Sequence, residues 1–439
     1  MTVNNKKRDK KLMKFFFALL IIGFVSSCGG VDGSPSSEET DDPYAALDRF
    51  AAQLQATTEV ARRSSASQVP FGRGNGATGI LRLLRRALDE ELAAADTRHP
   101  FFQIQDAWYA RLGMSNPDNL YLIARIDDDG VYRISGRRGT TADFTIQVYQ
   151  GYPGSRRPMV AKGSIGLDTL HIDADGNFQI ILGGTPRQKN WIELQPHSRR
   201  VVVRYTYGDW NEERAGGLRI ERLAFDEIPS APVDDTGTAA RIDAASAYLY
   251  DAQAGYMRIA DWFVSDLSVN SLSPIGKVSG EVQGRLTDQY TVRGRYRVRD
   301  DQALVVTTRP SKARYQGFQL GTDWFEALDF RTQITSVNAE QAKLSSDGVY
   351  RFVIRTRDPG YANWLDASSA PQGLMVLRWQ GVSVLDSADQ PTIEMVDFES
   401  LADSFPDDEK RVTVAERREQ LDQRRLAIDR RYGLHAASK

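Results

Sequence analysis

The chain has 439 residues, of which 41% are hydrophobic, 56 are basic and 58 are acidic, so its formal net charge is −2. This balance excludes the basic surface by which proteins bind nucleic acid or anionic lipid headgroups. The single cysteine, Cys28, excludes an intramolecular disulfide framework, so packing must supply the stability. The length allows two or three domains with cores of their own.

The N-terminus has the three parts of a secretory signal. Six basic residues precede an apolar run at residues 15–25, and Ser26 and Ser27 then precede Cys28. The apolar run has 11 residues, whereas a membrane-spanning helix needs ~20. We therefore predict a signal peptide at residues 1–27. Its removal leaves 50 basic and 57 acidic residues, a net charge of −7.

The segment from Val25 to Cys28 resembles the lipobox of bacterial lipoproteins. The resemblance implies that the thiol of Cys28 carries a diacylglyceryl group and that the freed amine is acylated, which anchors the protein durably. Gly29 and Gly30 follow in place of the aspartate that retains such proteins in the inner membrane, so the resemblance implies the outer membrane of a bacterial cell envelope. The alternative is an ordinary cleaved signal with a chance cysteine.

Residues 28–43 are rich in Gly, Ser and acidic residues and predict a flexible tether. Residues 44–114 predict a helical module, in which Leu47, Phe50 and Leu54 recur at helical spacing, as do Leu81, Leu84, Leu88 and Leu92. Residues 74–79 match the three-glycine dinucleotide fingerprint, but no strand precedes them as that motif requires. We therefore predict that the glycine-rich segment at residues 72–79 is a hinge between two helices.

Residues 115–231 predict a first β-rich unit, because short alternating runs surround the Asp-Gly turns at residues 127–130 and 173–176 and favour hairpins. Residues 201–207 predict a further strand. Residues 232–277 predict a linker and a helix with an apolar stripe of Leu249, Ala252, Tyr256, Ile259 and Phe263, and residues 278–400 predict a second β-rich unit.

Residues 401–439 predict a C-terminal helix opened by a capping box at Thr413 and Glu416. Its inward stripe is predicted as Val414, Leu421, Ile428 and Tyr432. Its three Arg pairs are interspersed with acidic residues, which favours a solvated, ion-paired face over a nucleic-acid or lipid surface.

The two β-rich units share one order of parts. Gly176 lies 14 residues before Asn190 and Gly348 lies 15 before Asn363; the next intervals, to Arg204 and Arg378, are 14 and 15 residues. A turn, a strand, an Asn-Trp pair, a loop and a strand with Arg before an aromatic residue recur in both units. We therefore expect a mainly β protein with helical additions, built from two related β-sandwich-like units.

The Asn-Trp and Arg-Trp pairs and the segment at residues 303–338 resemble the bacterial family catalogued as domain of unknown function 1214. The resemblance covers most of residues 115–400. It implies a β-sandwich fold and transfers no catalytic residue.

Few residues suggest chemistry. None of the four histidines, His99, His171, His197 and His435, forms a helical pair, and no cysteine completes a zinc site. Asp173, Asp175 and Asn177 alternate like the start of a calcium loop, but the glycine is misplaced and a turn is favoured. We expect no metal and no cofactor.

The candidate ligand-binding residues are those repeated between the units: Asn190, Trp191, Arg204, Asn363, Trp364, Arg378 and Trp379. Exposed tryptophan beside arginine would stack on a sugar or bind an anion. Alternatively, tryptophan fills the core and asparagine caps a turn, which we favour because residues repeated with a fold usually serve it.

These features predict a membrane-anchored envelope lipoprotein that acts as a binding or structural module without catalysis. Its expected partners are the membrane, through the N-terminal lipid, and a glycan, an anionic small molecule or an envelope protein, but not nucleic acid. The alternative is an envelope-facing carbohydrate-active hydrolase or lyase that uses paired carboxylates drawn from Glu193, Asp209, Asp358 and Asp366.

Overall fold

The computed structural model describes residues 41–155, 159–223, 233–277, 286 and 289–433. The predicted signal peptide, Cys28, most of the predicted tether and His435 lie outside the described residues. Within the part of the chain that the structure describes, no helix is long and apolar enough to cross a membrane.

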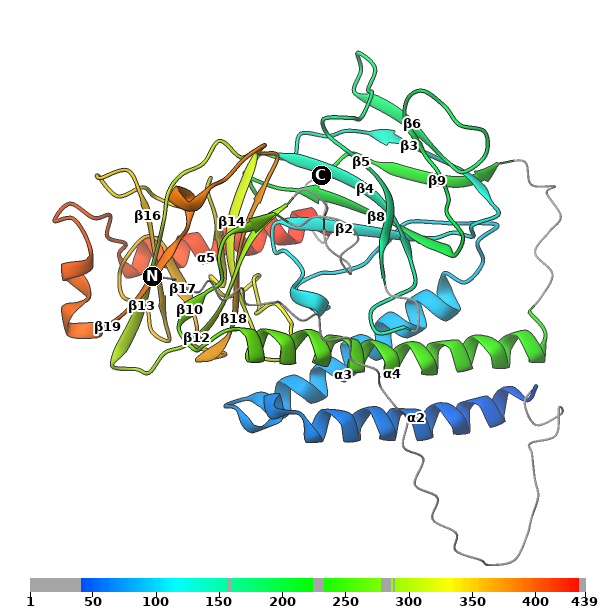
Figure 1. Cartoon of the computed structure of the whole chain (residues 1–439), viewed down its shortest axis with the longest axis horizontal. Coiled ribbons are helices and arrows are strands. Elements are labelled where there is room, and N and C mark those ends of the chain that lie inside the picture. Colours follow the sequence, from blue (N-terminus) through cyan, green and yellow to red (C-terminus); the bar gives the residue numbers. More distant parts are fainter. Residues whose placement is uncertain (1–40, 156–158, 224–232, 278–285, 287–288, 434–439) are drawn as a thin grey trace, which may run out of the picture.

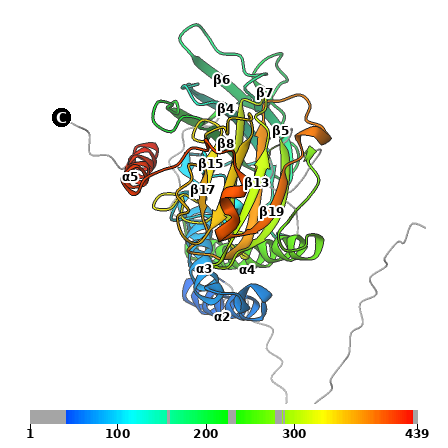
Figure 2. The same cartoon turned by 90° about the vertical axis from the view of Figure 1, so that its left-hand side faces the viewer.

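A layer of helices lies beneath the sheets (Figures 1 and 2). Its members are α2 (Pro43–Arg63), a 3₁₀ turn (Ser65–Gln68), α3 (Gly72–Leu88), a π-helical turn (Asp89–Ala93) and α4 (Asp235–Asp266). Helix α4 packs on both α2 and α3, and Leu83, Ala87, Leu249 and Ala252 are buried in their shared core. The insert after the first β unit therefore joins the N-terminal module in space. It begins inside the predicted linker, since the Asp234 side chain accepts from Gly237 N at 2.8 Å and caps the helix.

The glycine-rich segment is the first half of α3, so the predicted hinge is wrong. A Cβ atom on Gly76 would overlap the Trp324 ring, and a Cβ atom on Gly79 would make a tight contact with the Glu326 carboxylate. The predicted leucine stripe is partly wrong: Leu84 and Leu92 pack against the helical core, but Leu81 is 61% exposed and Leu88 is 39% exposed, while Ile80 and Leu83 are buried. The glycines form the face of α3 that contacts the second β unit, and their lack of side chains lets the helix axis approach it closely.

The first β unit consists of two sheets packed on one core. A five-stranded sheet has the order β1-β2-β8-β4-β5, and a four-stranded sheet has the order β7-β6-β3-β9. The strands are β1 (Gln103–Ile104), β2 (Asn119–Arg125), β3 (Val131–Arg137), β4 (Asp143–Gln150), β5 (Ala161–Gly166), β6 (Asn177–Leu182), β7 (Trp191–Ile192), β8 (Ser198–Thr206) and β9 (Leu218–Leu223).

The second β unit repeats this plan. One sheet has the order β10-β12-β18-β14-β15, with β11 also paired to β12, and the other has the order β17-β16-β13-β19. The strands are β10 (Ser271–Leu272), β11 (Gly276–Lys277), β12 (Tyr290–Arg297), β13 (Gln302–Thr308), β14 (Tyr315–Gly321), β15 (Ser336–Asn338), β16 (Tyr350–Arg355), β17 (Trp364–Asp366), β18 (Gln372–Gln380) and β19 (Thr392–Asp397).

The expected fold class is confirmed, including the two related β units. Strands β2, β8, β4 and β5 follow the same order as β12, β18, β14 and β15, and each unit has one parallel pair, β6 with β7 and β16 with β17. The hairpins predicted at the Asp-Gly turns are wrong. Strands β2 and β3 belong to different sheets, and residues 170–172 form no strand. The Asp173 side chain stabilises its turn by accepting hydrogen bonds from Asp175 N and Asn177 N. Such a turn does not determine which strands pair, because that depends on the whole sheet.

Alternation along β8 and β18 separates two faces. Val203 and Tyr205 point into the core of the first unit, and Leu377 and Trp379 point into the core of the second. The residues between them point to the back of each sheet, which faces α4 and forms the site described below.

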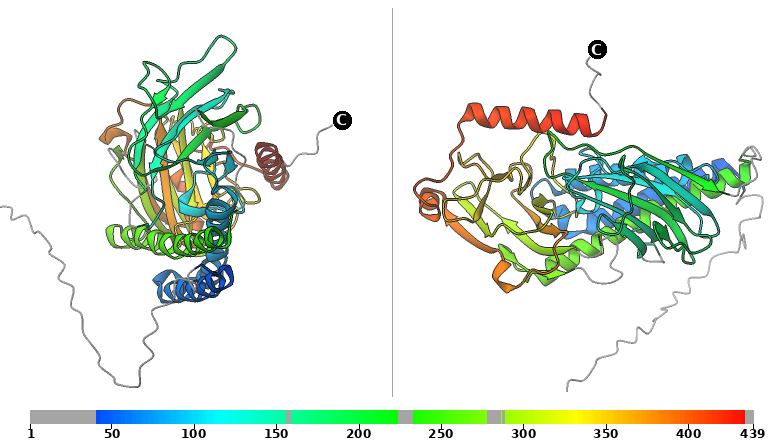
Figure 3. Two further views of the ribbon diagram at one scale, coloured as in Figure 1. Left: turned by 90° about the vertical axis from the view of Figure 1, so that its right-hand side faces the viewer. Right: turned by 90° about the horizontal axis from the view of Figure 1, so that it is seen from above.

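Helix α5 (Val414–Arg431) lies along one side of both units (Figure 3). Its capping box is confirmed, but its predicted inward stripe is partly wrong: Val414 is 77% exposed, whereas Arg417 and Arg424 are buried. Arg417 pairs with Asp358 at 2.9 Å, and Arg424 donates to Phe330 O at 2.6 Å. The arginines therefore fasten the helix to the β units, and the solvated-face prediction is wrong for these two residues.

Candidate functional site

A cavity of about 380 Å³ lies at the junction of the two β units, between their sheets and α4. Its walls come from β2 and β8 of the first unit, from β12 and β18 of the second, and from the middle and end of α4. Its size falls within the range of small-molecule sites, and such sites combine apolar walls with a few converging polar groups.

Arg204 and Arg378 both line this cavity from equivalent positions. Arg204 lies opposite Tyr121 of β2, and Arg378 lies opposite Thr291 of β12. Each guanidinium donates through Nη1 to a glutamine, Gln147 on β4 or Gln319 on β14. The duplication of the β unit has thus brought two equivalent arginines, each held by an equivalent glutamine, to a single cavity.

The second nitrogens of these two guanidinium groups have different acceptors. Arg204 Nη2 donates to the Tyr149 hydroxyl at 3.0 Å, and Arg378 Nη2 donates to the carbonyl oxygen of Met114 at 2.8 Å. Both of these acceptors of Arg378 are neutral, and burial lowers the pKa of its guanidinium. Among the described residues, Arg378 forms no salt bridge.

The other end of the cavity holds balanced charges. Arg86 pairs with Asp106 at 3.1 Å, and Arg200 pairs with Glu90 at 2.8 Å. The Tyr248 hydroxyl donates to Glu90 Oε1 at 3.0 Å. Burial raises the pKa of Asp106 to about 6, against the opposing effect of the Arg86 guanidinium.

Two buried polar atoms on the β12–β18 side have no hydrogen-bond partner within the described chain. They are Gln380 Nε2 and Arg293 Nη1, and both residues line the cavity. Gln380 is 2% exposed, and its Oε1 accepts from the Thr206 hydroxyl at 3.3 Å. Arg293 pairs with Asp266 at 3.1 Å and covers the Trp262 ring at 3.8 Å. Unpaired buried donors are costly and uncommon, so they mark a place where a ligand would complete the bonding.

Apolar side chains close the cavity on the α4 side. Tyr256, Ile259 and Phe263 form part of the stripe predicted for this helix, and they face Phe325 and Val376. The rings of Phe263 and Phe325 lie 5.5 Å apart.

The repeated Asn-Trp pairs lie away from the cavity and fasten parallel strands. Asn190 and the backbone of His171 exchange two hydrogen bonds, at 2.9 and 2.6 Å, and Asn363 exchanges two with Lys343, at 2.8 and 2.7 Å. Trp191 Nε1 donates to Gly183 O at 2.9 Å. Trp364 Nε1 does the same to Arg355 O at 3.0 Å.

Trp379 is 1% exposed and belongs to the second core. The cavity therefore receives the two arginines of the predicted set, and the tryptophans and asparagines lie elsewhere in the two units.

The four candidate carboxylates line neither of the two larger cavities of the described chain. Asp358 lies near enough to Asp366 for its charge to add to the effect of burial, which raises the pKa of Asp366. Asp209 accepts from Asn211 N at 2.7 Å in a turn, and Glu193 is exposed. Asp358 pairs with Arg417, and burial raises the pKa of Asp366, which accepts from Gln333 Nε2 at 3.2 Å. Each carboxylate has a local partner or faces solvent, so the arrangement brings no two of them to one cleft.

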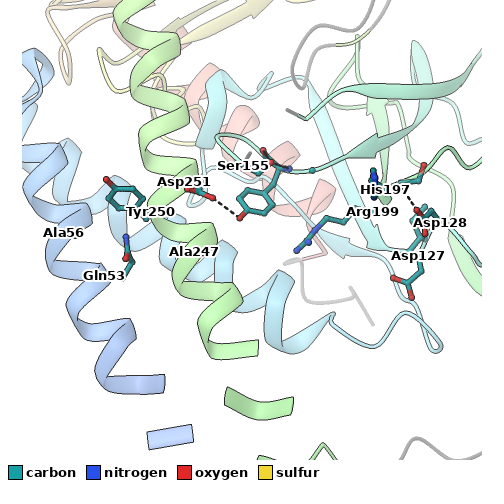
Figure 4. A pocket seen from close by; sticks show the side chains of 14 residues that line it. Gln53, Ala56, Asp127, Asp128, Ser155, His197, Arg199, Ala247, Tyr250 and Asp251 are labelled. Carbon is teal, nitrogen blue, oxygen red and sulfur yellow. Dashed lines mark hydrogen bonds between the residues drawn. The ribbon is translucent and has the colours of Figure 1, made fainter. Parts of the chain in front are cut away.

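A second, more open cleft of about 930 Å³ lies between α2, α4 and the first β unit (Figure 4). The Tyr152 hydroxyl donates to Asp251 at 3.2 Å, and the His197 N–H donates to Asp128. Two more of its polar side chains have partners outside the cleft, since Asp127 accepts from Thr97 and Arg199 donates to Glu91. Among the described residues, no three His, Cys, Asp or Glu side chains are grouped to hold a metal ion.

Sequence reasoning missed Gln147, Gln319, Gln380 and Arg293. Gln147 and Gln319 stand at equivalent places in apolar strands, Ile-Gln-Val in β4 and Phe-Gln-Leu in β14. A polar residue repeated within two apolar runs was therefore the available signal. No sequence feature marks Gln380 or Arg293, because their role depends on the junction.

Solved structures give the fold a close counterpart. The chain is similar to an uncharacterised protein from Burkholderia cenocepacia, at 29% identity and a TM-score of 0.75, over 81% of this chain and 98% of that one. A protein from Vibrio parahaemolyticus matches at 10% identity and a TM-score of 0.42, over 73% and 98% of the two chains. No family model matches the chain, and no curated protein matches it. The fold thus defines a class, a duplicated β-sandwich protein with a helical layer over the junction.

Proposed function

We propose that this protein is a lipid-anchored envelope protein that binds a small molecule in the cavity between its two β units. The observation that carries the proposal is the pair of equivalent arginines, Arg204 and Arg378, which two copies of the fold direct to one cavity. Neither guanidinium is needed for the sandwich cores, because both lie on the backs of their sheets. The apolar wall of α4 supplies the burial that a ligand needs, and the polar groups supply orientation.

The anchor in this proposal is Cys28, with residues 28–43 as a tether to the body. Two or three acyl chains on one residue would hold the protein at a membrane, because each buried methylene contributes ~0.8 kcal/mol. The binding body would then work at the membrane surface of the envelope.

Binding can be tested with N-phenyl-1-naphthylamine, a neutral apolar dye whose fluorescence increases in an apolar site from which water is excluded. The purified protein should bind the dye saturably at one site. Val376→Trp should abolish binding, because Val376 is 5% exposed and lines the cavity. Val384→Trp is the matched control, since Val384 is 70% exposed on the same unit. Equal dye binding by both folded variants, or no saturable binding to the wild type, would contradict the proposal.

A further inference from the structure

We propose that the ligand of the junction cavity is an amphiphilic oxyanion. Its carboxylate or phosphate group binds at Arg378 and Gln380, and its apolar body lies against Ile259, Phe263 and Phe325. This inference rests on the proposed function and assigns the chemical class of the ligand.

At one end of the cavity the buried arginines are paired with carboxylates, whereas Arg378 at the other end has no such partner within the described chain. Arg86 and Arg200 each have a carboxylate partner, at 3.1 and 2.8 Å. Arg378, by contrast, donates to an amide oxygen and a backbone carbonyl. A partly buried cation with neutral acceptors is destabilising, and an anion placed beside it would offset that cost.

Asp118 is the carboxylate that acts electrostatically on Arg378, and its oxygens already accept hydrogen bonds from other residues. Asp118 favours the charged form of Arg378 electrostatically. Its carboxylate accepts from Trp210 Nε1 at 2.7 Å, from the Tyr315 hydroxyl at 2.7 Å and from Asn338 Nδ2 at 2.8 Å. Asp118 therefore joins the two β units, and among the described residues it makes no hydrogen bond or salt bridge to Arg378.

Three donor side chains lie on one face of the sheet and line the cavity where the oxyanion would bind. Arg378 and Gln380 are two residues apart on β18, so their side chains share one face of the sheet. Arg293 lies on the neighbouring strand, paired with Val376. Gln380 Nε2 and Arg293 Nη1 are buried with no acceptor in the described chain. A guanidinium with an adjacent amide donor suits the paired oxygens of a carboxylate or phosphate.

The opposite end of the cavity is a poorer place for an anion, because its arginines already have carboxylate partners. Arg86 is paired with Asp106 and Arg200 with Glu90, although Arg200 Nε is a buried donor with no acceptor in the described chain. Gln105 Oε1, a buried acceptor with no donor in the described chain, also lines this end. The apolar surface of Ile259, Phe263 and Phe325 lies on the helical side and takes the body of the ligand.

The test measures displacement of N-phenyl-1-naphthylamine by ligands of one chain length: octanoate, octyl phosphate, octanol and octylamine, all below the concentration at which they form micelles. Octanoate or octyl phosphate should displace the dye at concentrations about tenfold lower than octanol, because charge-assisted bonds are the strong ones. The better of the two anions identifies the headgroup, and octylamine should be the weakest.

Two variants connect the preference to the residues. Arg378→Gln should reduce the preference for the anion over octanol to about twofold, since the charge-assisted bonds are lost. Gln380→Leu should weaken anion binding while the fold is kept. This variant tests the anion preference if Arg378→Gln does not fold. Arg219→Gln is the control, because the Arg219 side chain is 79% exposed on β9.

The outcomes separate the two proposals. If octanol or octylamine displaces the dye as well as the anions do, or if both cavity variants keep the anion preference, the ligand class is wrong although the cavity still binds. If the wild type binds neither dye nor any of the four ligands, the proposed function and this inference fail together.

Discussion

Gly76 of α3 lies directly against the indole ring of Trp324 in the second β unit. A Cβ atom on Gly76 would lie 2.5 Å from Trp324 Cζ2, and Trp324 Nε1 donates to Gly72 O at 2.8 Å. The glycine-rich segment is therefore the contact surface by which the helical layer packs on the β units.

This contact predicts opposite effects for two glycines of the same helix. Gly76→Ala should lower the free energy of unfolding by about 1–3 kcal/mol, because overpacking a close contact forces the backbone to shift. Gly74→Ala should raise it by about 0.5–1 kcal/mol, because nothing lies within 4 Å of its Cβ position and alanine favours a helix. Urea denaturation of both variants measures the two values. A hinge at residues 72–79 would instead be disturbed similarly by both substitutions.

The equivalent asparagines should differ in their contribution to stability. Asn363 is 3% exposed, whereas Asn190 is half-buried, although each makes two hydrogen bonds to the backbone of a neighbouring loop. Asn363→Ala should cost about 1–3 kcal/mol, because it removes two part-buried hydrogen bonds made by a buried side chain. Asn190→Ala should cost about 1 kcal/mol, because water can reach its partners. Chemical denaturation of both variants decides the order, and a larger loss for Asn190→Ala would contradict this assignment.

Asp106 should make stability depend on pH. Its folded-state pKa of about 6 lies above the ordinary value of 3.8, so the folded protein binds this proton more tightly than the unfolded chain does. The contribution to the free energy of unfolding therefore falls as pH rises from about 4 to 6, and it stays constant above that range. At about 1.4 kcal/mol per pKa unit, the full change is at most ~3 kcal/mol.

Asp106→Asn removes this titration and keeps an oxygen acceptor for Arg86, which donates to Asp106 Oδ1 at 3.1 Å. The variant should gain stability relative to the wild type as pH rises from 4 to 7. Urea denaturation at several pH values measures the difference. A difference that is flat or moves the other way would show that burial does not control this carboxyl.

Cys28 can be tested in the cell envelope, because no second cysteine complicates the result. The wild-type protein should partition with membranes and yield an N-terminal peptide that carries acyl chains on Cys28. Cys28→Ala should give soluble protein or unprocessed precursor, and mass spectrometry of the N-terminal peptide distinguishes the two. A processed Cys28→Ala protein that stayed with the membrane would contradict a lipid anchor at this residue.

Local patterns predicted much of the fold. Alternation and Asp-Gly turns indicated the β units, and the spacing of Asn190 and Arg204 against Asn363 and Arg378 indicated their duplication. These features depend on residues within one unit, so they are visible along the chain. The stripe on α4 was predicted for the same reason, since its buried residues recur with the helical period.

The predictions that were wrong depend on what each element meets in space. Arg417 and Arg424 face inward on α5 because they find Asp358 and a backbone carbonyl on the β units, which no pattern within the helix reveals. The segment at residues 72–79 is the start of α3, and its glycines pack against Trp324, which is far along the chain. In both cases a tertiary contact outweighs local propensity.

The sequence alone determined that the chain consists of two copies of a β unit with helical additions, because periodicity and repetition are local properties. Only the tertiary structure decided that Arg204 and Arg378 line one cavity between the sheets and α4. It also decided that the Asn-Trp pairs hydrogen-bond to the backbone within each unit. The physical reason is that burial and hydrogen-bond partners are set by the packing of two sheets and a helix that are distant in sequence. A repeated residue therefore shows that a position matters to both copies, and its surroundings in the folded chain show whether it serves the core or the cavity.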